Sequence, residues 1–91
     1  MNTNQIKTLE KTLKACANKR RLEILQFLKA KGKASVGEIA KKIRLSFRST
    51  SRHLSVLSHN DLVDKNQIKL MVEYQLVPSA SSIVKEVIKI L

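Results

Sequence analysis

Apolar residues recur at intervals of three and four along the first sixty positions, the period that places side chains on one face of a helix. Four segments share this spacing. Their apolar or inward positions are, in chain order, Ile6, Leu9, Leu13 and Ala17; Leu22, Ile24, Leu25, Phe27 and Leu28; Ile39, Ala40 and Ile43; and Thr50, Leu54 and Leu57. The pattern therefore predicts four helices, the second ended by Gly32 and the last by Asn60 and Asp61.

Residues that can cap a helix stand before each of these segments. They are Thr3 or Asn4, Asn18, Ser35 and Ser46. Glu38 follows Ser35 by three residues, the spacing of a capping box in which the two side chains satisfy exposed amides reciprocally. The third and fourth helices are short and closely connected, so they predict a helix-turn-helix.

After residue 61 the period changes to the two-residue alternation of a strand. Apolar and polar residues alternate from Ile68 to Leu76, and residues 62–65 can form a preceding strand. Residues 62–77 therefore predict a β-hairpin that turns near Asn66 and Gln67, although no glycine marks the turn.

A last apolar segment follows Pro78, which ends the strand. The serines at 79, 81 and 82 can start a helix whose apolar positions are Ile83, Val84, Val87, Ile88 and Leu91. Because 91 residues suffice for one core and not for two, we predict a single domain over residues 1–91. Its class is mostly α (α+β), a winged helix-turn-helix with five helices and a two-stranded β-hairpin wing between helices four and five.

The composition of the chain indicates what kind of core it has and in which compartment it is found. Apolar residues make up 43% of the chain and only three side chains are aromatic, so the core should be ordered and aliphatic. The lone Cys16 cannot form an intrachain disulfide and fits a reducing compartment. No apolar run approaches about 18 residues, and the N-terminus lacks the apolar region of a signal peptide. We therefore expect a soluble cytoplasmic protein without a membrane partner.

The chain is strongly basic, with 18 Lys and Arg against seven Asp and Glu and a formal net charge of +11. Only four of the basic residues follow position 60, where four acidic residues balance them. The positive field therefore belongs to the helical part of the chain. A charge of this size and placement indicates a nucleic-acid partner and association with the nucleoid.

The predicted fourth helix carries a polar face that the core does not need. Arg48, Ser51, Arg52 and Ser55 stand at i, i+3, i+4 and i+7, and no acidic residue lies between positions 39 and 60. In the major groove arginine binds guanine, and slim serines permit close approach. We therefore expect residues 46–58 to be the recognition helix of a sequence-specific protein that binds double-stranded DNA.

The wing, residues 62–77, is expected to touch the DNA backbone or the minor groove. The full set of expected DNA contacts lies on the recognition helix, on the turn before it and on the wing. It comprises Ser46, Phe47, Arg48, Ser49, Ser51, Arg52 and Ser55, then Lys42 and Arg44, then Lys65 and Lys69.

The runs ANKRRLEILQFL and SVGEIAKKIRLSFRSTSRHLSVLSHNDLV, followed by the hairpin ending in VEYQL, resemble the ArsR/SmtB family of winged-helix repressors. The positions that match its signature are Leu45, Ser46, Ser51, His53, Leu54 and Leu57, with Leu62 and Val63 at the entry to the wing. The resemblance covers about residues 9–77 without a gap. It implies a repressor with a five-helix winged fold that dimerises through its first and last helices, residues 1–17 and 79–91.

Three positions depart from that family's pattern. Lys19 stands where the family usually has proline, Phe47 where it often has a polar residue, and Lys69 where the wing often has glycine. Phe47 is therefore either a core residue or a contact to a thymine methyl group.

The first and last helices show more apolar surface than one small core can cover, so we expect a homodimer. The expected interface residues are Ile6, Leu9, Leu13, Ile83, Val84, Val87 and Leu91.

Many proteins of that family release DNA when metal binds to cysteines of the third helix or to His and acidic ligands of the last. Here residues 36–43 contain no cysteine, and residues 79–91 contain no His, Cys or Asp. His53 and His59 are six residues apart and face different sides of one helix. We expect no metal and no cofactor, and the sequence does not specify an effector. Cys16 is either a buried packing thiol or the site of an intersubunit disulfide.

The sequence offers no set of acid, base and nucleophile, so we expect a non-enzyme. Two alternatives to DNA binding remain: a winged-helix interaction or assembly module without sequence-specific DNA binding, and RNA binding. RNA binding favours exposed aromatic residues, and the chain has only Phe27, Phe47 and Tyr74. The basic face of the fourth helix favours DNA over both.

Overall fold

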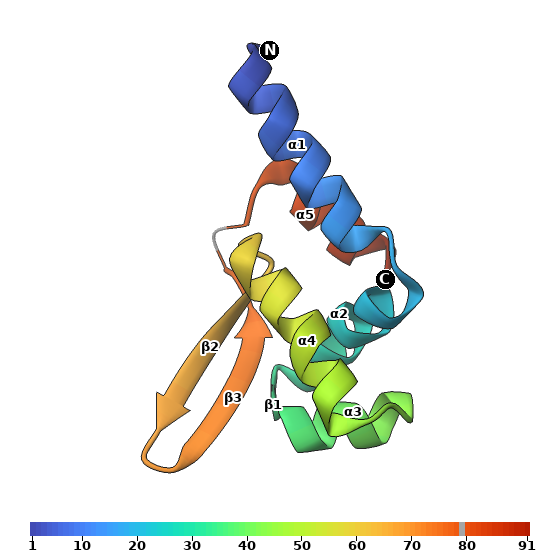
Figure 1. The fold of residues 1–91 in the computed structure, drawn as a ribbon, viewed down its shortest axis with the longest axis vertical. Helices are drawn as coiled ribbons and strands as arrows, with labels where there is room; N and C mark the ends of the chain where they lie inside the picture. The colour runs from blue at the N-terminus through green and yellow to red at the C-terminus, as the bar shows by residue number, and fades with distance from the viewer. Residues whose placement is uncertain (79) are drawn as a thin grey trace.

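The computed structural model describes residues 1–78 and 80–91, and over these residues it contains five α-helices and a three-stranded antiparallel sheet. The elements are α1 (Thr3–Cys16), α2 (Lys19–Lys31), β1 (Lys33–Ser35), α3 (Val36–Ile43), α4 (Phe47–His59), β2 (Val63–Ile68), β3 (Met71–Leu76) and α5 (Ser82–Ile90). The winged helix-turn-helix architecture expected from the sequence is confirmed (Figure 1). Residue 79, where the last helix was expected to start, lies outside the described residues.

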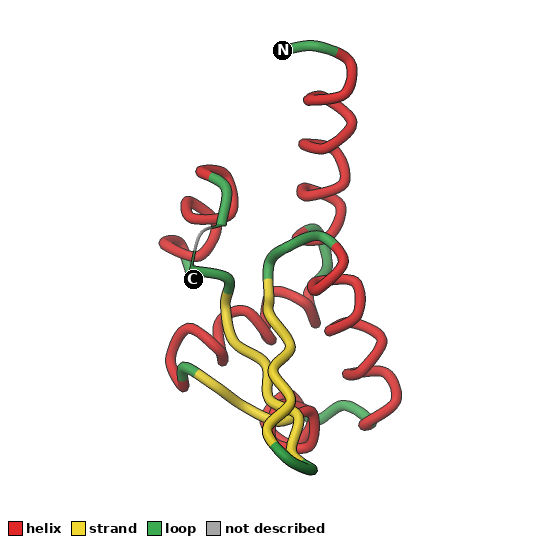
Figure 2. Tube along the Cα trace, turned by 90° about the vertical axis from the view of Figure 1, so that its left-hand side faces the viewer, coloured by secondary structure: helices red, strands yellow, loops and turns green. Residues whose placement is uncertain are grey.

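The elements are distributed along the long axis of the molecule. The N-terminal part of α1 lies at one end, with α5 nearer to that end than to the other (Figure 1). The opposite end contains α3, the beginning of α4 and the tip of the β2–β3 hairpin (Figure 2). The predicted recognition helix and wing therefore share one end, and the two predicted dimerisation helices lie away from it.

Most of the predicted helix caps are present. The side chain of Asn18 accepts from the Arg21 amide, Ser46 Oγ accepts from the Ser49 amide at 3.1 Å, and Ser35 and Glu38 form the expected capping box. The prediction for the first helix was wrong, because its cap is Asn2 and not Thr3 or Asn4. Gln5 lies three residues after Asn2, and the two side chains form a capping box of their own with distances of 2.8 Å.

The hairpin turns at Lys69 and Leu70, so the predicted turn near Asn66 and Gln67 was wrong. Asn66 and Gln67 are paired residues of β2, and the last pair before the turn joins Ile68 to Met71. A tight two-residue turn of this kind needs positive φ at a central position, and Lys69 supplies it with φ 57°. Leu70 consequently lies in the turn and not on the buried face of a strand.

A third strand, β1, was not predicted. Its three residues pair antiparallel with β3, with Lys33 opposite Gln75 and Ser35 opposite Glu73. A segment this short shows no detectable alternation. It ties the beginning of α3 to the base of the wing, because Ser35 is at once the last residue of β1 and the N-cap of α3.

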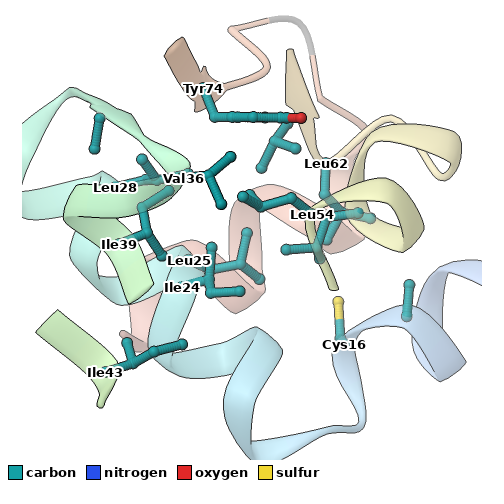
Figure 3. Close-up of a cluster of buried hydrophobic side chains, with 14 of the residues drawn as sticks. Cys16, Ile24, Leu25, Leu28, Val36, Ile39, Ile43, Leu54, Leu62 and Tyr74 are labelled. Carbon is teal, nitrogen blue, oxygen red and sulfur yellow. The ribbon is translucent and has the colours of Figure 1, made fainter. Parts of the chain in front are cut away.

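The core is aliphatic, as expected, and lies between α2, α3, α4 and the base of the wing (Figure 3). Ile24, Leu25, Ile39, Leu54 and Leu62 have no exposed surface. Cys16 closes one side of this cluster and Tyr74 the other. Because the middle of α2 contributes Ile24, Leu25 and Leu28 to this core and contacts both α3 and α4, the two short helices pack against a common support.

None of the helices within residues 1–78 and 80–91 combines the length and the apolar character that a membrane-spanning segment requires.

Candidate nucleic-acid interface

The inward face of α4 determines which of its side chains reach solvent. Thr50, Leu54 and Leu57 stand at i, i+4 and i+7 and are completely buried. Arg48 precedes Thr50 by two residues, and Arg52 precedes Leu54 by two. Both arginines are exposed. Ser55 is exposed beside them and Ser51 is half-buried. The polar face expected from the sequence is therefore brought together on one side of a helix whose rotation is fixed.

Phe47 is the first residue of this helix and is 63% exposed, so of the two alternatives left open by the sequence the core position is excluded. The first turn of α4 lies beside α3 at one end of the molecule (Figure 1). Contact with a thymine methyl group stays a prediction for this side chain.

The turn before α4 adds positive charge to the same end. Arg44 ends α3 in the left-handed conformation, with φ 55°, and its amide bonds to α3 carbonyls. The amide of Leu45 bonds to the carbonyl of Ala40 at 3.0 Å, which closes the turn and leaves Ser46 free to cap α4. Lys42 and Arg44 are both exposed. The expected basic contacts at the end of α3 and in this turn are therefore exposed next to the first turn of α4.

Arg20 has a positioning role that the sequence reasoning missed. It lies in the first turn of α2, where cations are unfavourable because the N-terminal end of a helix carries partial positive charge. Its Nη1 donates to the carbonyl of Ile43 at 2.7 Å, at the last residue of α3. This bond satisfies a carbonyl at the negative end of α3 and joins α3 to α2.

Arg21 makes the corresponding connection to α1. Its Nε donates to the carbonyl of Ala15 at 2.6 Å, and its Nη2 donates to the carbonyl of Lys14 at 3.1 Å. Three consecutive cations, Lys19 to Arg21, with no acidic residue in the first turn of α2, were the available signal for both roles. Arg20 and Arg21 stand there because the carbonyl groups at the ends of α3 and α1 lie next to the beginning of α2. No local sequence pattern identifies which helix ends lie there.

His53 lies on the side of α4 that faces α2. Its Nδ1 lies 3.4 Å from Nη1 of Arg21, and a neutral imidazole can accept a hydrogen bond there. Burial lowers the pKa of His53, and the positive charges of Arg21 and Arg20 lower it further. The ring is therefore held neutral by its surroundings and serves the packing of α4 against α2.

His59 differs from His53 in its surroundings. It is exposed, and its Nδ1 lies 3.1 Å from the carbonyl of Ser55. Within the part of the chain that the structure describes, no three His, Cys, Asp or Glu side chains gather closely enough to hold a metal ion.

Cys16, the last residue of α1, is buried. Burial raises the pKa of its thiol, while the nearby Arg21 acts in the opposite direction. The protonated, less reactive form is favoured, which agrees with the packing role among the two alternatives.

The wing presents both of its expected contacts. Lys65 in β2 and Lys69 in the turn are exposed. Of the two acidic residues of the hairpin, Asp64 lies near its base opposite Gln75, and Glu73 lies opposite Asn66, one pair closer to the turn than Lys65. Lys69 therefore places a positive charge in the turn itself, at the end of the molecule where α4 begins.

The apolar surface expected at a dimer interface is present on α1 and α5. Ile6 is 55% exposed, and a shallow groove of about 360 Å³ runs along α1 beside Leu9 and Leu13. A second groove, of about 440 Å³, lies between the beginnings of α1 and α5 and is lined by Leu9 and Ile83 among others. Val87 and Leu91 are half-buried.

Val84 must be removed from that expected interface. Only 3% of its surface is exposed, because the side chain packs into the core of its own chain. The apolar stripe of α5 is divided, and one edge of it is already covered before any second copy binds.

The sequence profile of a helix-turn-helix domain family matches residues 17–66, the segment from the end of α1 into β2. The transcriptional activator HlyU of Vibrio cholerae is 39% identical over 79 residues, which cover 87% of this chain and 69% of the relative.

Solved structures agree with the fold. HlyU from Vibrio cholerae superposes with a TM-score of 0.81 at 36% identity, covering 99% of this chain and 92% of that one. HlyU from Vibrio vulnificus gives a TM-score of 0.75 at 39% identity, covering 96% and 85%. A homodimeric winged helix-turn-helix DNA-binding domain from Mycobacterium bovis shares the fold, with a TM-score of 0.82 at 24% identity, covering 96% and 77%.

The lowered pKa of His53 predicts a specific pH dependence of stability. The unfolded chain binds the proton more readily, with a pKa of about 6.5, so the free energy of unfolding is largest above that pH. It should fall as the pH decreases through about 6.5 toward the lower pKa of the folded state. Urea unfolding at about pH 7.5 and pH 5.5 measures this difference.

The test variant is His53→Gln, which should reduce the difference between the free energies of unfolding at the two pH values. An equal pH dependence in wild type and His53→Gln would show that the burial of His53 and its cationic neighbours have no such effect.

Proposed function

The chain belongs to the ArsR/SmtB-type helix-turn-helix transcription regulators, and we propose that it binds duplex DNA as a homodimer, with α4 of each protomer in the major groove. The observation that carries this proposal is the two-sided character of α4. One side is sealed into the core, and the other presents Arg48, Arg52 and Ser55 to solvent. A helix of this width enters the major groove, and its exposed arginines reach base edges there.

We assign different contacts to different parts of this surface. Arg48 and Arg52 are the principal base contacts, because a guanidinium can bond to two acceptors of one guanine. The helix serines at 46, 49, 51 and 55 support them at close range. Phe47 would contact a thymine methyl group. Lys42 at the end of α3, Arg44 in the turn that follows, and Lys65 and Lys69 on the wing bind phosphates.

The basic charge at this end favours DNA binding over the interaction-module alternative. The outward face of α4 is bordered by Lys42 and Arg44 and free of acidic residues, which complements the phosphates of a duplex. RNA binding is disfavoured because Tyr74 is buried and Phe27 packs against the core, which leaves Phe47 as the one exposed aromatic side chain in the described residues.

The homodimer is supported by the apolar grooves along α1 and α5. A two-fold axis between them would cover Ile6, Leu9 and Leu13 of α1 against the same helix of a second copy. It would also leave the α3–α4 end of each protomer free for DNA, because the two ends are opposite (Figure 1). The Mycobacterium bovis domain that shares this fold is homodimeric.

We further propose that the chain acts without catalysis, in the cytoplasm at the nucleoid. Repression, the direction implied by the resemblance in sequence, stays a prediction, since the Vibrio cholerae relative is named an activator. A bound dimer represses or activates according to the position of its site relative to the promoter.

Alanine substitution of Arg48 and Arg52 tests the DNA-reading role of α4. If Arg52 bonds to a guanine, Arg52→Ala should lose about 1–3 kcal/mol on the preferred duplex and relax the preference at one base pair. If it binds only phosphate, the loss should be equal on every duplex, and the slope of log affinity against log salt should fall by about one. Lys69→Ala should follow the second pattern.

Lys85→Ala is the matched control, because Lys85 is exposed on α5, away from the end that carries α3 and the tip of the wing. Should Arg48→Ala, Arg52→Ala and the double variant bind duplex as tightly as wild type, α4 does not read DNA. The interaction-module alternative would then replace this proposal.

Ile6→Asp tests the dimer without disturbing the core, since the side chain is exposed in the protomer. A carboxylate without a partner would be forced into an apolar contact, so the variant should sediment as a 10.3 kDa monomer where wild type sediments as a dimer. Lys7→Asp, at the neighbouring exposed position, should remain dimeric. A wild-type protein that is monomeric at micromolar concentration would contradict the proposed dimer.

A further inference from the structure

A groove of about 270 Å³ lies between α2, the base of the hairpin and α5, and neither the DNA interface nor the proposed dimer uses it. Val84 and Ile88 line it from α5, and Leu62, Leu76 and Val77 line it from the base of the hairpin. Leu62 and Val84 are buried in the core, and the other three side chains are half-buried. The floor of the groove is therefore aliphatic and continuous with the core.

The size and lining of the groove limit the shape of a ligand. Small-molecule sites usually have about 300–1,000 Å³, and this groove is slightly smaller. No aromatic side chain lines it in the described part of the chain, so the face of a planar ring would find no stacking partner. A narrow aliphatic chain fits such a floor best.

Lysine side chains border the groove. Lys29 comes from α2, and Lys85 and Lys89 come from one side of α5, since they are four residues apart. All three are exposed. Nζ of Lys89 lies 3.6 Å from Oε1 of Glu86, whereas Lys29 and Lys85 form no ion pair with any described residue. Two of the three cations at this border thus have no anionic partner in the chain.

The charges around the groove select an anion. Like charges at the border of one groove repel one another, and an anionic group placed among them relieves this repulsion. None of the described residues that line the groove is acidic. An aliphatic floor with a cationic border therefore matches a molecule that has a short apolar chain and one negatively charged end.

Duplex DNA and a second copy of the chain match this groove less well. The groove lies beside α5 at the base of the hairpin, away from the end that carries α3 and the first turn of α4 (Figure 1). The groove assigned to the second copy is lined by Leu9 and Ile83, and neither residue lines this one. A dimer formed through α1 and α5 therefore leaves this groove open to a small molecule.

We propose that this groove binds a medium-chain aliphatic carboxylate, which acts as an effector of the protein. The aliphatic chain lies on the floor formed by Leu76, Val84 and Ile88, and the carboxylate lies between Lys29 and Lys85. Binding of the ligand does not depend on DNA. Its regulatory effect rests on the proposed function.

The groove lies where the hairpin meets the predicted dimerisation helix. The amide of Val77 donates to the carbonyl of Leu62 at 3.1 Å, which closes the base of the hairpin. Nζ of Lys29 donates to the carbonyl of Lys89 at 3.5 Å, which joins α2 to the end of α5. An aliphatic chain entering between these elements moves α5 away from the hairpin and thereby changes the position of the wing relative to the second copy. The ligand should therefore weaken DNA binding, and DNA should weaken ligand binding by the same factor.

The first measurement uses the free protein with octanoate as the probe. Octanoate at about five times its dissociation constant should raise the melting temperature by about 4–8 °C. Hexanoate should bind about tenfold more weakly, because each buried methylene strengthens binding roughly fourfold. Octanol keeps the chain and lacks the charge, so it should also bind about tenfold more weakly than octanoate.

Variants of the groove separate the charged border from the apolar floor. The double variant Lys29→Ala/Lys85→Ala should lower the octanoate affinity about tenfold and leave the octanol affinity unchanged. Ala80→Leu fills part of the groove and should weaken both ligands. Lys33→Ala is the matched control, because Lys33 is an exposed lysine of β1 that does not line the groove. The melting temperature of each variant without ligand shows that it is folded.

The second measurement adds a duplex that the wild-type protein selects from a random pool. Saturating octanoate should lower the affinity of the wild-type protein and of Lys33→Ala for this duplex about fivefold or more. The same concentration should have less effect on Lys29→Ala/Lys85→Ala.

Octanoate binding that is absent, or equal in the wild-type protein and the double variant, would overturn the inference and leave the DNA-reading role of α4 intact. Lysine-dependent binding with unchanged DNA affinity would overturn the effector role. Failure of the wild-type protein to bind any duplex would overturn the proposed function, and the melting temperatures with octanoate would still test the groove.

Discussion

The burial of Leu54 and Leu57 in the core is the interaction on which the candidate interface depends. Each fully buried leucine contributes about 1.5–3 kcal/mol relative to exposure, and only one rotation of α4 about its axis buries both. Thr50 completes this face, and its hydroxyl finds no hydrogen-bond partner among the described residues. That an unsatisfied polar group is tolerated here indicates that the packing of the face prevails over local hydrogen bonding. The outward direction of Arg48 and Arg52 follows from this rotation and not from any contact of their own.

A second set of contacts fixes where that helix lies relative to the rest of the chain. Arg20 bonds to the end of α3, and Arg21 bonds to the end of α1 and approaches His53 of α4. Two adjacent side chains of α2 thus connect a helix of the expected dimer interface to the helix-turn-helix. These are direct side-chain contacts between packed helices. In a dimer, the separation between the two copies of α4 would therefore be determined by rigid helices and not by flexible segments.

Much of this arrangement could be predicted from the sequence, because helices with long apolar stripes are determined locally. The four helices before residue 61, the Ser35–Glu38 capping box and the polar face of α4 all follow from spacing alone. The turn of the hairpin could not be placed, because it depends on Lys69 adopting a positive φ that its residue type does not favour. The alternation of apolar and polar residues includes Leu70, so the pattern predicted a strand residue where the structure has the exposed turn.

Other features depended on contacts between distant segments. The strand β1 is too short to show a period and exists because β3 pairs with it. Val84 belongs to the same stripe as Ile83 and Val87, and only the packing of α5 on the core decides which of them is covered. The roles of Arg20 and Arg21 required knowing which helix ends lie next to α2. In each case the residues are visible in the sequence, and the segment that they contact is not.

The central claim, that two copies of α4 read one duplex, is tested most directly by selecting bound duplexes from a random pool and determining their sequences. The account predicts an inverted repeat whose half-site centres are separated by about 10 base pairs or a multiple of that, since both helices must meet the same face of the duplex. A pool without an enriched sequence, or an enriched site without two-fold symmetry, would contradict it.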